Sequence, residues 1–284
     1  MTTTTPATTH APGSTRGKRV DLAPLAWHEG LDAAVREATR RNVPIVSLRL
    51  LGRLDDELSC ANSRFFRETL YVDARVQRSL AGFVLHWRSV RPVPVVTIDF
   101  GDGRILTRTL TGNSAHLILD ARGRPVDALP GLYTRDGFLA ALSRAREIAS
   151  STAALEGPAR TRALASFHAS ALTAARSPPI ASPQQPSANP FAARAAGAIA
   201  QTKMMVERPL LDHIDGLTST IARDESFNEG TLHPRIHARF VAGVLDDEAA
   251  LTSWIYRELF LMPDDDPWLG LVDSPIAAWA GLAP

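Results

Sequence analysis

The chain has 284 residues, of which 45% are hydrophobic and 21% charged, a composition typical of a soluble globular protein with one or two domains. Its 31 basic and 30 acidic side chains give a formal charge of +1, which predicts neither nucleic acid nor a membrane surface as a partner. The single cysteine, Cys60, excludes an intramolecular disulfide and a zinc site made of several thiolates, and no apolar run is long enough to span a bilayer.

Helices and strands alternate in the first half of the chain. Residues 1–20 are rich in threonine and poor in apolar side chains, so we expect a disordered arm. Apolar periodicity and Gly or Pro turns then predict, in order, helix Leu31–Arg41, strand Pro44–Leu51, helix Cys60–Tyr71, a short helix through Val76 and Leu80, strands Val84–Trp87, Val95–Phe100, Ile105–Leu110, His116–Asp120 and Val126–Leu129, and helix Phe138–Ile148. This order predicts an α/β domain over residues 21–150, with a mixed sheet and flanking helices.

The second half is predicted to be helical. Residues 151–176 form a helical extension, 177–192 a Pro/Ser-rich linker, and 193–284 a helical C-terminal module. The four helices expected in this module are Ala193–Val206, Leu210–Arg223, Pro234–Val244 and Asp247–Leu261. The module either stands alone, where it could bind a protein partner, or packs on the first domain as a helical lid.

Cys60 is the main candidate for chemistry. It opens a predicted helix, where unpaired backbone N–H groups and the peptide dipoles stabilise a thiolate. Ser63 lies one turn further on and can donate a hydrogen bond to the sulfur, and Arg64 adds positive charge. The alternative is an inert, buried cysteine that behaves as a small hydrophobe.

These features resemble the thioredoxin-like superfamily. The matching pieces are Trp27, the helix Leu31–Arg41, the segment Asn42–Val46, the sequence CANS at Cys60–Ser63, and the segment Ser114–Gly123. The resemblance implies a thioredoxin-like fold over residues 21–150. It also implies a monothiol redox protein of the C-x-x-S type, with Cys60 and Ser63 as the catalytic pair and Arg64, Asn113 and Ser114 lining the substrate groove.

Two departures from the family pattern shape the expected chemistry. Ser63 stands where the family has a resolving cysteine, and Ser114 stands where it has a cis-proline, so a trans peptide is expected there. One thiol permits a mixed disulfide with a protein or with a small thiol, glutathione being the candidate co-substrate; no bound cofactor is predicted. The absence of a secretory signal pattern favours the cytoplasm. The competing hypothesis is a non-catalytic interaction module that keeps the fold without the thiol chemistry.

A weaker alternative is a metal-dependent hydrolase that uses C-terminal histidines. Glu229, His233 and His237 are spaced four residues apart, and two histidines at this spacing can bind zinc from one helix face. Pro234, however, predicts a helix that begins at about His233 and leaves Glu229 off that face, so no metal site is predicted. His116 is a candidate proton relay to Cys60, although a half-buried strand histidine is the preferred interpretation.

Overall fold

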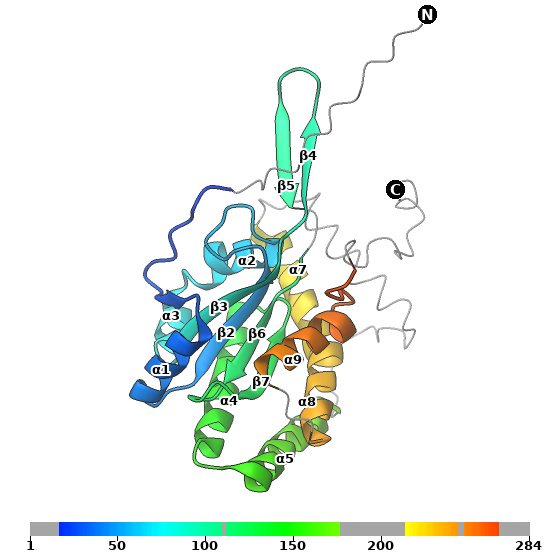
Figure 1. Ribbon diagram of the computed structural model, residues 1–284. Helices are drawn as coiled ribbons and strands as arrows, with labels where there is room; N and C mark the ends of the chain where they lie inside the picture. The colour runs from blue at the N-terminus through cyan, green and yellow to red at the C-terminus, as the bar shows by residue number, and fades with distance from the viewer. Residues whose placement is uncertain (1–16, 110–111, 177–213, 244–246, 267–284) are drawn as a thin grey trace, which may run out of the picture.

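The computed structural model describes residues 17–109, 112–176, 214–243 and 247–266. A five-stranded sheet with the order β1-β3-β2-β6-β7 lies at its centre (Figure 1). β1 (Trp27–His28) and β2 (Ile45–Leu51) run parallel to β3 (Val84–Arg91), β6 (Ala115–Leu119) pairs antiparallel with β2, and β7 (Pro125–Pro130) pairs antiparallel with β6. All seven residues of β2 are buried, as expected for the central strand of a sheet that is covered on both faces.

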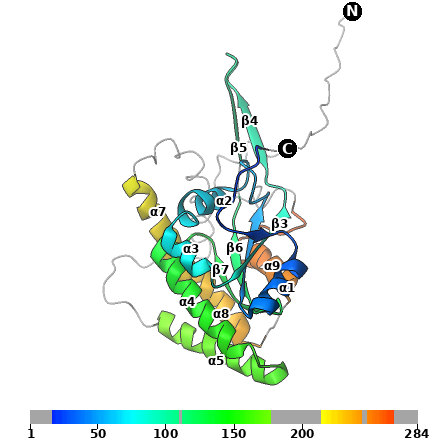
Figure 2. The same ribbon diagram turned by 90° about the vertical axis from the view of Figure 1, so that its left-hand side faces the viewer.

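Helices cover both faces of this sheet. The N-terminal helical elements are α1 (Leu31–Arg41), α2 (Ala61–Phe65), the π-helical turn η1 (Phe66–Leu70), α3 (Ala74–Leu80) and α4 (Arg135–Thr152). Figure 2 shows α1 and α9 (Glu248–Trp254) on one side of the sheet and α3 and α4 on the other. Successive β2 side chains point to opposite faces, which explains why Arg49 bonds to α9 while Leu48, paired with His116, faces the α4 side.

A β-hairpin projects from the domain as a separate two-stranded sheet (Figure 1). It consists of β4 (Val95–Asp99) and β5 (Ile105–Thr109), paired antiparallel. Gly101 and Gly103 have positive φ values of 76° and 89°, which glycine adopts without a steric penalty, so they allow the tight turn that the sequence predicts. Phe100 and Ile105 are exposed near this turn.

The described C-terminal helices pack on the first domain, which corresponds to one of the two arrangements that the sequence left open. They are α5 (Gly157–Arg176), α7 (Ile214–Phe227), the π-helical turn η2 (Asn228–Leu232), α8 (His233–Val241), α9, and the π-helical turn η3 (Ile255–Leu259). α8 packs against α5 and β7. Ile236 and Tyr256 belong to the same hydrophobic core as the strands of the sheet.

The predicted elements agree with the described structure apart from shifts at their ends, with one correction at the N-terminus. Residues 17–20 were expected to be part of a disordered arm, but their backbone is hydrogen-bonded to the loop at residues 55–57. The Val20 amide donates to the Asp55 carbonyl at 2.9 Å, and the Glu57 amide donates to the Lys18 carbonyl at 3.0 Å. Residues 1–16, the linker 177–192 and the helix predicted at Ala193–Val206 lie outside the described residues. Within the described ranges, no helix combines the length and apolar character needed to cross a membrane.

Candidate functional site

The structure brings the predicted thiol site together at the carboxyl end of β2. Cys60 immediately precedes α2, and its Sγ lies 2.9 Å from Oγ of Ser63 and 3.3 Å from Oγ of Ser114. Both hydroxyls can donate a hydrogen bond to the sulfur. The only cis peptide bond among the described residues is the one before Pro24, so the peptide before Ser114 is trans, as predicted. The thiol is thus in contact with one hydroxyl from its own helix and with a second from a residue 54 positions further along the chain.

The thiol is fully enclosed. Cys60 has an exposed fraction of 0%, and Ser63 and Ser114 are equally buried. Gly112 lies directly over Cys60, since a Cβ added to this glycine would fall 2.3 Å from Cβ of Cys60. An external reagent therefore cannot reach the sulfur in this conformation.

Tyr256, from the C-terminal segment, is hydrogen-bonded to the loop that covers the thiol. Its hydroxyl donates to the backbone carbonyl of Asn113 at 2.9 Å, while the Asn113 side chain accepts from Nδ2 of Asn62 at 2.8 Å. Tyr256 is completely buried, and burial raises the pKa of its hydroxyl well above the usual value. Asn113 therefore connects α2, on one side of the thiol, to η3 on the other.

Arg49 anchors α9 to the sheet. Its side chain is 1% exposed. The guanidinium donates to Oγ of Ser47 at 2.6 Å and to Oγ1 of Thr252 at 3.1 Å, and it forms an ion pair with Glu248. Burial lowers the pKa of Arg49, and the Glu248 carboxylate opposes this effect. Because a buried cation needs such a partner, the pair fixes the C-terminal segment beside the thiol site.

The remaining predicted residues have structural contacts in this conformation. Arg64, expected to bind substrate, donates to the Ser59 carbonyl at 2.6 Å and to Oγ1 of Thr109 at 2.8 Å, and so connects the loop before Cys60 to the end of β5. His116, the candidate relay, is buried with its Nε2 2.7 Å from the hydroxyl of Tyr71. Burial lowers the pKa of His116 to about 3, so the ring is neutral, as a buried strand histidine would be.

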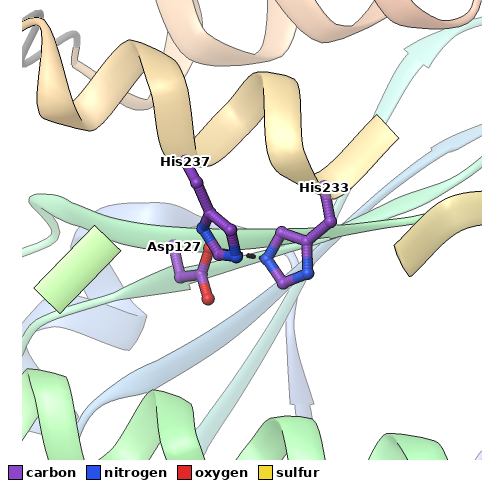
Figure 3. Close-up of side chains that lie close together, drawn as sticks. All are labelled: Asp127, His233 and His237. Carbon is purple, nitrogen blue, oxygen red and sulfur yellow. Dashed lines mark hydrogen bonds and ion pairs between the residues drawn. The ribbon is translucent and has the colours of Figure 1, made fainter. Parts of the chain in front are cut away.

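A second cluster of chemical groups lies between β7 and α8 (Figure 3). Nε2 of His233 lies 3.0 Å from Oδ1 of Asp127, and Nδ1 of the same ring lies 3.0 Å from Oε1 of Glu229. That Glu229 oxygen also accepts from the Tyr133 hydroxyl at 2.9 Å. His237, one helical turn after His233, points into the same region.

The pKa shifts of His233 and Asp127 indicate which of these groups carries a proton. Burial alone would lower the pKa of His233, but the Asp127 and Glu229 carboxylates outweigh it and raise this pKa to about 9. Burial raises the pKa of Asp127, yet the neighbouring His233 cation brings it well below its usual range. In the absence of other ligands, His233 is therefore an imidazolium between two carboxylates.

The imidazole rings of His237 and of His168, which lies on α5 beside His237, are neutral. Burial lowers the pKa of His168, and it lowers that of His237 to about 3. Nε2 of His168 lies 3.0 Å from the Val126 carbonyl, which can only accept, so this nitrogen carries the hydrogen. Nδ1 of His168 is then an acceptor, and Nδ1 of His237, 2.8 Å away, must be the donor. The free lone pair of His237 is consequently on Nε2.

Sequence reasoning found only part of this cluster. It singled out Glu229, His233 and His237 but placed Glu229 off the shared helix face; the π-helical turn η2 instead continues into α8 and keeps Glu229 beside His233. It missed Asp127 and His168, which come from β7 and α5 and carry no local motif. No protein-family model, curated protein or solved structure matches the chain.

Proposed function

We propose that the chain is a thioredoxin-like monothiol protein in which Cys60 exchanges with an external disulfide. The observation that carries the proposal is the contact of one sulfur with two hydroxyls, Ser63 in the C-x-x-S sequence and Ser114 before β6. The strand order β1-β3-β2-β6-β7, with Cys60 after the central strand, supports the family resemblance. Exchange of this kind suits a reducing compartment such as the cytoplasm.

The proposed step is a thiol–disulfide exchange. The Cys60 thiol loses its proton to solvent, and the thiolate attacks one sulfur of a protein disulfide or of glutathione disulfide. A new S–S bond forms, the disulfide breaks, and the second sulfur leaves as a thiolate; Cys60 is oxidised and the leaving thiol is reduced. Ser63 and Ser114 donate hydrogen bonds to the sulfur while it is negatively charged. Since the described residues contain no second cysteine, an external thiol must resolve the mixed disulfide.

This chemistry requires the site to open. The covering groups are Gly112, Asn113 and Tyr256, and the last of these belongs to a segment anchored through Arg49 and Glu248. Movement of that segment would break the Tyr256 hydrogen bond and allow Gly112 and Asn113 to move off the sulfur. The sheet would stay folded, because all its strands come from residues 27–130. The described conformation is the closed state in this proposal.

A second candidate function is a non-catalytic interaction module. The observation that favours it is the complete burial of Cys60, which is the usual state of a cysteine that only packs. In that case the Ser63 and Ser114 contacts satisfy the polar atoms of a closed core, and the thiol never meets a partner.

Native-state alkylation separates the two candidates. The folded chain would be treated with iodoacetamide from pH 6 to pH 9, and the modified fraction followed by mass spectrometry, with the urea-unfolded chain giving the intrinsic rate. The Tyr256→Phe variant removes the hydrogen bond to Asn113, worth about 1 kcal/mol, and should raise the rate about fivefold. Tyr71→Phe is the matched control, since it loses a buried hydroxyl contact with His116 on the other face. A folded thiol that stays unmodified at every pH, with no response to Tyr256→Phe, would refute the redox function and favour the interaction module.

A further inference from the structure

We propose that Asp127, His233 and His237 form a binding site for a divalent first-row transition metal ion, with zinc as the preferred ion. One potential ligand atom from each residue lies within 4.8 Å of the other two (Figure 3). The three residues are 3%, 2% and 7% exposed, so the site is built into the interior and is not a surface cluster. Two imidazoles and one carboxylate are a donor set typical of zinc and of non-haem iron sites.

The surroundings orient both imidazoles for a metal ion. Glu229 receives the Nδ1 hydrogen of His233, which leaves Nε2 as the nitrogen that faces Asp127. His168 receives the Nδ1 hydrogen of His237 and leaves the lone pair on Nε2. Metal-bound histidines characteristically donate their second N–H to a carboxylate or another acceptor, which fixes the ring and strengthens the ligand. Here both rings have such a partner.

Charge balance also favours a dication. Asp127 and Glu229 place two carboxylates around His233, each with an oxygen 3.0 Å from a ring nitrogen. Arg144 lies 3.7 Å from Glu229, whose side chain is partly exposed, so this arginine already offsets the Glu229 charge and leaves Asp127 as the buried carboxylate. A divalent ion bound at this point would place positive charge beside the buried Asp127 carboxylate, where uncompensated charge is costly.

The geometry is close to what a tetrahedral ion requires. Zinc bonds of about 2.0–2.1 Å put ligand atoms roughly 3.3 Å apart, so atoms that now lie within 4.8 Å of one another need to approach by at most about 1.5 Å. The ligands join β7 to α8, and His168 adds α5 through its contact with His237. The bound ion would therefore fasten the C-terminal helices to the sheet. This role is independent of Cys60. Glu229 acts as a partner of His233 instead of a ligand, and the site is one that the sequence did not predict.

Cobalt(II) uptake by the full-length, untagged and metal-free chain tests the site. We expect one equivalent to bind with the intense visible absorption of a tetrahedral centre. In Asp127→Asn and His237→Gln, we expect the affinity for cobalt(II), measured by this absorption, to fall at least tenfold. The matched controls are Asp99→Asn on the hairpin and His28→Gln on β1, which should bind as the wild type does. Absence of uptake, or uptake that both site variants retain, would overturn the proposal and leave the cluster as a hydrogen-bonded network.

A measurement on the wild type keeps the test decisive if a site variant does not fold. Zinc at a hundred times its Kd should raise Tm by about 5–10 °C. X-ray absorption of the zinc-loaded chain should show only nitrogen and oxygen neighbours at about 2.0–2.1 Å. A sulfur neighbour at about 2.3 Å would place the ion on Cys60 and contradict the assignment, as would an unchanged Tm.

Discussion

Replacing Glu248 with glutamine should release the C-terminal segment from the sheet. Glu248 lies on α9 and forms an ion pair with Arg49, whose side chain is almost completely buried on the central strand. Glutamine has nearly the same shape and keeps one oxygen that can accept from Arg49, but it removes the negative charge. The guanidinium then stays in the interior without a counter-charge.

The expected cost follows from the burial of the pair. Removing one partner of a buried ion pair costs about 3–5 kcal/mol, and the retained amide oxygen of glutamine places Glu248→Gln at the lower end, near 3 kcal/mol. The second partner of Glu248 is Arg88, whose side chain is 60% exposed, so loss of that contact adds little. If the whole of this free-energy loss makes local opening of α9 and η3 easier, the population of the open state rises about a hundredfold, since each 1.4 kcal/mol corresponds to a factor of ten.

Urea unfolding followed by circular dichroism gives the stability change, and iodoacetamide labelling of Cys60 gives the opening. Glu258→Gln on the same segment is the matched control, because this side chain is exposed, and its effect should stay within about 0.5 kcal/mol. The double variant Arg49→Met with Glu248→Leu should recover most of the loss, because both charges leave together. A Glu248→Gln chain within 1 kcal/mol of the wild type, with an unchanged labelling rate, would refute the anchoring role of the pair.

Three further outcomes follow from burial and packing. Burial lowers the pKa of His116 to about 3, so the folded state keeps this ring neutral while the unfolded chain takes up a proton below pH 6.5. Stability therefore falls as pH falls from 6.5 towards 3, and the slope of unfolding free energy against pH should be smaller in His116→Phe by about 1.4 kcal/mol per pH unit. Equal slopes in the two chains would show that the ring titrates normally. Gly112→Ala should lower the unfolding free energy by about 1–3 kcal/mol, because the added Cβ would lie 2.3 Å from Cβ of Cys60. Gly30→Ala is the control: a Cβ there meets open space, so the unfolding free energy should change by less than about 0.5 kcal/mol. Equal effects of the two substitutions in thermal unfolding would contradict the close approach. Ile105→Thr on the hairpin should leave stability within about 0.5 kcal/mol, since Ile105 is 65% exposed, and a larger loss would mean that the hairpin is packed in solution.

The sequence predicted the sheet and its helices well because local signals coincide with burial. The helix Leu31–Arg41 was predicted to the residue, since its apolar spacing is regular and Asn42 ends it in a left-handed conformation. β3 runs four residues further than predicted, to Arg91. Three of these four side chains are polar or charged, so the extension has no apolar pattern, and it is stabilised by pairing with β2. Such tertiary pairing has no signature in a single segment.

The candidate sites were harder to predict because their partners come from distant segments. Cys60, Ser63 and Ser114 were predicted to lie together, and they do. Their enclosure by Tyr256 was not foreseen, because that contact spans 143 residues and depends on how the C-terminal segment packs. The histidine cluster shows the same limit: helical spacing identified His233 and His237, but nothing near Asp127 in the sequence indicates that β7 lies opposite them.

Incubation of the folded chain with glutathione disulfide tests the thiol function most directly, with the intact mass as the readout. The proposal predicts a single glutathione adduct on Cys60 that a reductant removes, that forms faster in Glu248→Gln than in the wild type, and that is absent from Cys60→Ser. An unmodified folded chain in both wild type and Glu248→Gln, under conditions in which the unfolded chain is modified, would contradict it.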